Sequence, residues 1–88
     1  MAVNARQLEA ALRERLAPQQ LQVQDDSAAH AGHAGAGEGS HYTVHIVSER
    51  FAGLSRVARH RLVYDALGSL IPQGIHALAI HARAPGEA

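Results

Sequence analysis

Residues 51–82 read FAGLSRVARHRLVYDALGSLIPQGIHALAIHA, a stretch that predicts a helix followed by a strand. Ser55 is suited to cap a helix that begins at Arg56, because its hydroxyl can accept a free backbone N–H. Four side chains recur at helical spacing and form one stripe: His60, Val63, Leu67 and Leu70. Three helix-breaking residues then predict the end of the helix: Gly68, Pro72 and Gly74.

The last part of this stretch, Ile75 to Ala82, is expected to form a strand. Alternation places His76, Leu78 and Ile80 on the face that the helices cover. The opposite face is expected to carry Ile75, Ala77, Ala79 and His81.

The residues before this stretch predict a first helix and two more strands. Asn4 and Gln7 have the spacing of a capping box, and leucines follow at helical spacing until Pro18. Leu21 and Val23 indicate a first strand. A second strand is expected to bury three alternating side chains: Tyr42, Val44 and Ile46. The two strands predict a hairpin around a glycine-rich loop over about 27–40.

The element order predicts an α+β fold, a small two-layer domain with the order α-β-β-α-α-β and a three-stranded mixed sheet. At 88 residues the whole chain, 1–88, is expected to be a single domain with a frayed tail over about 84–88.

Composition excludes several classes of function. The chain has no cysteine, so it has neither a thiol nucleophile nor a thiolate ligand of its own. Its formal net charge is zero, which disfavours a general attraction to nucleic acid or acidic membranes. No signal peptide or membrane span is predicted, and the expected location is cytoplasmic.

Seven histidines are the outstanding feature, because imidazole is a common metal ligand. Three lie on the polar side of the predicted strands and are interpreted as solvated residues: His41, His45 and His81. His60 falls on the apolar stripe of its helix and is interpreted as a structural residue bonded to a carbonyl.

His76 lies at the edge of the covered face, where two interpretations are equally balanced: half-buried packing, or part of a site. His30 and His33 lie in the glycine-rich loop and are either surface residues or ligands that approach His76. Two or three imidazoles do not complete a tetrahedral zinc site. A [2Fe–2S] centre with two histidines and two thiolates is known chemistry, and both thiolates would have to come from a partner.

Four segments resemble the BolA family: Asp26-Ser27 with His30, HYTVHIVSERF at 41–51, FAGLSRVARHRLVYDAL at 51–67, and GIHALAIHA at 74–82. This resemblance implies a fold similar to the type II KH arrangement. It also implies a non-enzymatic adaptor that pairs with a monothiol glutaredoxin, shares a [2Fe–2S] cluster with it and with glutathione, and serves cluster trafficking or iron sensing. By this resemblance His76 matches the final-strand ligand and His30 the loop ligand, with His33 as the alternative.

The family is also linked to transcription control, so the alternative is a DNA-binding regulator. Four arginines around the second helix could form a local basic surface: Arg50, Arg56, Arg59 and Arg61. The turn FAGLS has one glycine, however, where nucleic-acid-binding KH domains have GxxG. No nucleophile, carboxylate pair or phosphate loop favours an enzyme. Alone, the chain is expected to be a monomer or a weak homodimer.

Overall fold

The structure is a computed structural model that describes residues 3–26 and 40–87, apart from the side chains of Ser40 and His76. Its elements, in chain order, are α1 (Ala5–Leu16), β1 (Gln20–Asp25), β2 (Ser40–Val47), the 3₁₀ helix η2 (Glu49–Phe51), α2 (Arg56–Leu67), α3 (Leu70–Gly74) and β3 (Ile75–Arg83). This order confirms the predicted α+β class and the predicted sequence of helices and strands.

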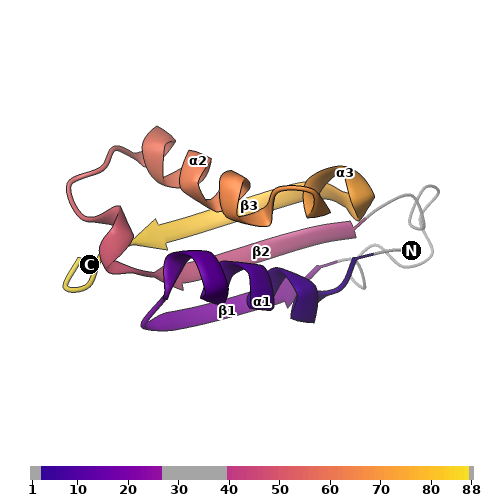
Figure 1. Cartoon of the computed structure of the whole chain (residues 1–88), viewed down its shortest axis with the longest axis horizontal. Coiled ribbons are helices and arrows are strands. Elements are labelled where there is room, and N and C mark those ends of the chain that lie inside the picture. The colour runs from indigo at the N-terminus through magenta and orange to yellow at the C-terminus, as the bar shows by residue number, and fades with distance from the viewer. Residues whose placement is uncertain (1–2, 27–39, 88) are drawn as a thin grey trace.

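The three strands form one mixed sheet in the order β1-β2-β3. β1 pairs with β2 in antiparallel fashion, as the predicted hairpin requires, and β2 pairs with β3 in parallel. Helices α1 and α2 lie side by side over one face of this sheet (Figure 1). The domain therefore has two layers, and the other face of the sheet is not covered by any described element.

Local sequence signals account for the helix ends. The Asn4 side chain accepts the Gln7 N–H at 3.0 Å, and the Gln7 side chain accepts the Asn4 N–H at 2.8 Å, so the predicted capping box is present. The Ser55 hydroxyl accepts the Ala58 N–H at 3.2 Å and caps α2, also as predicted. Gly68 ends α2 with a φ of +48°, a conformation that glycine adopts without strain.

The core lies between the helix layer and the middle strand. Tyr42, Val44 and Ile46 of β2 are buried, which confirms the predicted alternation. They pack against residues of the helices and η2 that are also buried: Leu8, Leu12, Leu16, Phe51, Val63, Ala66 and Leu67. With one phenylalanine and one buried tyrosine, this core is mostly aliphatic, and its stability depends on burial of branched side chains.

Ser48 links the end of the sheet to the first helix. Its side chain is only 1% exposed, and its hydroxyl donates to the Leu16 carbonyl oxygen at 2.6 Å. The Ser48 hydroxyl oxygen also accepts the Arg50 N–H at 3.1 Å, which caps η2. The Ser48 N–H donates to the Arg83 carbonyl at 2.9 Å and so extends the β2–β3 pairing. One buried hydroxyl therefore joins α1, η2 and the last residue of β3.

A β-bulge at the start of β3 corrects the predicted alternation. Ser40 pairs with Ile75 and His41 with Ala77, so His76 is the extra residue on β3. Because the bulge inverts the alternation, Ile75 packs against the core together with Leu78, and not on the opposite face as the sequence predicted.

Gly68 ends the second helix as predicted, but Leu70, predicted to lie on the stripe of that helix, begins a separate short helix, α3. In the tail, predicted to fray over about 84–88, Ala84 is buried and its N–H donates to the Glu87 carboxylate at 2.9 Å. A partner far away in the sequence, Arg59, holds that carboxylate in place. Among the described residues no helix is both long and apolar enough to span a bilayer.

Candidate functional site

Of the three predicted ligands, only the backbone of His76 lies in the described part of the structure. It is the second residue of β3 and the extra residue of the bulge. His30 and His33 lie outside the described residues, so their prediction as loop ligands stays a prediction. Among the residues described with their side chains, no three histidines, aspartates or glutamates gather as a metal site would require.

The segment that contains His30 and His33 leaves and re-enters the sheet beside this bulge. At its first end, the Asp26 N–H donates to the His41 carbonyl at 2.7 Å, and the Asp26 carboxylate accepts the Thr43 hydroxyl. At its other end, β2 begins at Ser40, and the next residue, His41, pairs with Ala77 of β3. Asp26 and Ser40, on either side of segment 27–39, therefore lie at the end of the sheet where the pairing of β3 with β2 begins and His76 lies.

A shallow hollow of about 490 Å³ lies on the sheet at this end. Its polar lining comes from Asp26, His41 and Thr43, and its β3 side includes Ala77 and Ala79. Small alanine side chains at these exposed positions leave the surface open to a docked macromolecule, because they extend little beyond the backbone.

The histidines that the sequence discounted lie on the uncovered face, as predicted, but two of them stack on each other. His41 and His45 are half-buried and His81 is exposed. The imidazole rings of His45 and His81, which are paired residues of β2 and β3, stack with centroids 4.5 Å apart and an angle of 7° between their planes. They are therefore a cross-strand pair and not independent solvated residues.

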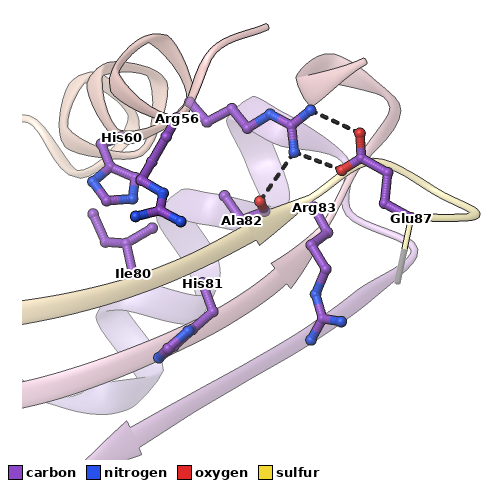
Figure 2. Close-up of a pocket in the computed structure, with 8 residues that line it drawn as sticks. Arg56, His60, Ile80, His81, Ala82, Arg83 and Glu87 are labelled. Atoms are coloured by element: carbon purple, nitrogen blue, oxygen red, sulfur yellow. Dashed lines mark hydrogen bonds and ion pairs between the residues drawn. The ribbon is translucent and has the colours of Figure 1, made fainter. Parts of the chain in front are cut away.

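A second concave site lies at the opposite end of β3, where its polar lining residues are Arg56, Arg59, His60, His81, Arg83 and Glu87. The pocket has a volume of about 520 Å³. Figure 2 shows Arg56 and His60 extending from α2 toward the edge of β3. His81 and Arg83 extend from β3 on the side of the strand away from α2. His60, predicted to be a satisfied core residue, is instead half-buried in this wall and makes no hydrogen bond within the described chain.

Arg59 and Glu87 close one end of this basic pocket. Two guanidinium nitrogens of Arg59 contact the two carboxylate oxygens of Glu87 at 2.6 and 2.8 Å, a bidentate pair. The hydrogen bond from Arg59 lowers the pKa of Glu87 to about 2, with help from the Ala84 N–H. The same hydrogen bond raises the pKa of Arg59. The glutamate is thus ionised at neutral pH and fully engaged by its arginine.

Sequence reasoning missed the basic pocket, although parts of its signal were present. Arg56 and His60 are one helical turn apart, and His81 and Arg83 are two residues apart on a strand, so each pair shares a face. Only the packing of α2 beside β3 brings the two pairs together. That packing involves residues more than 20 positions apart, which no local pattern reveals.

Comparison with known proteins agrees with this fold. Residues 12–87 match the family model described as BolA-like protein. The chain is 48% identical over 84 residues to an uncharacterized Sinorhizobium protein encoded in the cobS 5′ region, with 91% of this chain and 89% of that protein covered. It is 45% identical over 82 residues to the SufE-like protein 1 of Arabidopsis thaliana, with 86% of this chain but only 22% of that protein covered.

A solved structure of BolA1 from Arabidopsis thaliana superposes with a TM-score of 0.83 at 39% identity, covering 100% of this chain and 98% of that one. A Vibrio cholerae protein named DNA-binding transcriptional regulator BolA is 46% identical over 74 residues, with 84% of this chain and 68% of that protein covered. Matches of this identity and extent, on a fold that superposes closely, show that the chain belongs to the BolA-like protein family.

Proposed function

We propose that this chain is a non-enzymatic iron–sulfur adaptor that pairs with a monothiol glutaredoxin. It would contribute histidine ligands, His76 and one of His30 or His33, to a [2Fe–2S] cluster shared with that partner and with glutathione. The cluster is cargo to be passed on, or a signal of iron supply to be sensed.

The observation that carries this proposal is that the bulge at His76 and the two residues that flank segment 27–39 lie at one end of the sheet. The bulge makes His76 an extra residue on β3, and bulges often redirect a side chain beside a functional site. Asp26 and Ser40, which flank segment 27–39, are held at the same end of the sheet by backbone pairing. In this proposal, the segment that contains His30 and His33 would be available to a ligand site at the end of the sheet where His76 lies.

Covalent geometry allows either loop histidine to meet His76. Two strand spacings separate β1 from β3, which is about 10 Å. His30 is four residues beyond Asp26, and four extended residues span up to about 14 Å. His33 is seven residues from Asp26 and from Ser40, so it also has the reach. The family resemblance favours His30.

The donor set of the chain suits a shared cluster better than a site of its own. With no cysteine, the chain offers imidazole nitrogen but no thiolate. Histidine ligands raise the reduction potential of a [2Fe–2S] centre relative to four thiolates. A thiol-bearing partner would therefore supply the sulfur, and the open, alanine-lined surface beside His76 leaves room for one.

A titration tests the proposal. The full chain is added to a monothiol glutaredoxin that carries a [2Fe–2S] cluster with glutathione, and the visible circular dichroism is followed together with size-exclusion chromatography. The native chain should change the spectrum and form a complex. His76→Ala should remove the spectral change, and His30→Ala or His33→Ala identifies the loop ligand.

His45→Ala is the matched control, because His45 lies on the same sheet but is stacked on His81 away from the bulge. It should behave like the native chain. An unchanged spectrum with the native chain, or equal loss in the His45 and His76 variants, would refute the adaptor proposal.

DNA binding is the second candidate, supported by the name of the Vibrio cholerae relative and by an exposed basic surface. Arg50, Arg56 and Arg61 are exposed on η2 and α2, whereas Arg59 is engaged by Glu87. Binding to promoter DNA should then weaken steeply with salt and with Arg56→Ala. If the native chain causes no gel shift of promoter DNA at low salt, this candidate function is excluded.

A further inference from the structure

The outer edge of β3 carries backbone donors that the sheet does not use. β3 is one of the two outer strands of the described sheet. The Arg83 carbonyl accepts the Ser48 N–H on the β2 side, whereas the Ala82 carbonyl accepts a nitrogen of Arg59 at 3.3 Å on the other side. Because the N–H and C=O of one strand residue point the same way, the Ala82 N–H and the Ile80 N–H both face the open edge.

Arginine and histidine side chains lie on both faces of β3 beside this edge. Arg56 and His60 extend toward it from α2 (Figure 2). His81 and Arg83 also line the pocket but extend over the uncovered face of the sheet, where His81 stacks on His45. Three arginines against one glutamate leave the pocket lining with a formal charge of +2, although the whole chain has a net charge of zero. Glu87 is already held by Arg59, and Arg56 forms no ion pair within the described residues.

We infer that this pocket binds a small molecule that carries a diphosphate group. Two outward N–H groups and two separate guanidinium groups suit an anion with more than one set of oxygens, because arginine binds phosphate oxygens in bidentate fashion. The volume of about 520 Å³ is in the range of small-ligand pockets. The site is independent of the cluster proposal, since it lies at the other end of β3 from His76.

The distribution of the basic residues favours a small anion over a nucleic-acid backbone as the ligand of this pocket. A duplex is held by a stripe of many basic residues, each of which neutralises a phosphate. Here three arginines and two histidines line one concave site, and one of these arginines is paired with Glu87. The nucleic-acid backbone therefore becomes an alternative that the experiment distinguishes.

The test is an NMR titration of the ¹⁵N-labelled full chain with inorganic pyrophosphate. Saturable shifts should be largest at the amides of Ile80 and Ala82 and small at Ala79 and His81, whose N–H groups point toward β2. Arg56→Gln and Arg83→Gln should each weaken binding about tenfold, the expected loss for one charge-assisted contact. Arg83→Lys keeps the charge and should recover only part of the affinity, since it loses the guanidinium fork.

Arg61→Gln is the matched control, because Arg61 is an exposed arginine of α2 outside the pocket and its loss changes the net charge equally. It should bind pyrophosphate like the native chain. The inference fails if the shifts do not saturate, or if Arg61→Gln weakens binding as much as Arg56→Gln. It also fails if duplex DNA shifts the same amides and pyrophosphate does not displace it.

Discussion

Replacement of Ser48 by alanine should destabilise the fold far more than the loss of one small polar group suggests. The hydroxyl is 1% exposed, donates to Leu16 at the end of α1 and accepts the Arg50 N–H at the start of η2. Its removal leaves a buried carbonyl without its donor, which costs roughly 1–3 kcal/mol. Loss of an N-cap adds about 1 kcal/mol. We expect a loss of about 2–4 kcal/mol.

That loss is a large part of the free energy of unfolding, which for a chain of this length is on the order of 4–13 kcal/mol. The melting temperature should fall by roughly 10–30 °C, because about 1 kcal/mol shifts it by 4–8 °C in a domain of this size. Urea denaturation should show a lower midpoint with an unchanged slope, since the surface exposed on unfolding is the same.

Two other serines calibrate this measurement. Ser55→Ala removes only the exposed cap of α2 and should cost about 1 kcal/mol. Ser69 is exposed and makes no capping hydrogen bond, so Ser69→Ala should change stability little. If Ser48→Ala were no more destabilising than Ser69→Ala, the reasoning that Ser48 joins α1, η2 and β3 would be refuted.

Two further predictions concern the core and the ion pair. Leu12 is fully buried in the core, so Leu12→Ala should lower the free energy of unfolding by about 2–5 kcal/mol, measured in urea; a smaller loss than that of Leu54→Ala, at a partly exposed site, would contradict the described packing. Glu87 has a pKa of about 2 in the folded chain against an ordinary 4.5, so its contribution to stability is complete above pH 4.5 and is lost as pH falls toward 2. A carboxyl ¹³C titration should find Glu87 still ionised at pH 3.5, whereas a midpoint near 4.5, or an unchanged midpoint in Arg59→Gln, would contradict the bidentate pair.

Features that depend on a few neighbouring residues could be predicted from the sequence. The Asn4–Gln7 capping box and the Ser55 cap involve partners three residues apart, so their spacing suffices. The buried alternation of β2 follows equally well, because each strand residue faces the side opposite to that of its neighbour. These local signals were enough to predict the element order.

Features that depend on distant partners could not be predicted. The bulge at His76 exists only relative to the pairing of β2, so the position of Ile75 was predicted on the wrong face. The tail is held by a pair 28 residues apart, Arg59 and Glu87, and its composition alone suggested fraying. His60 matched a core stripe, but the same stripe extends to the open edge of β3, where the histidine lines a pocket.

The central claim is that an imidazole nitrogen of this chain binds iron whose sulfur ligands belong to a partner. Pulsed electron paramagnetic resonance of the reduced complex, formed with cluster-loaded glutaredoxin, glutathione and the chain, tests it directly. The account predicts strong nitrogen couplings that change when only this chain carries ¹⁵N-labelled histidine and that are altered in His76→Ala but not in His45→Ala. Nitrogen couplings that do not change with the ¹⁵N label, or that are the same in His76→Ala as in the native chain, would contradict the claim.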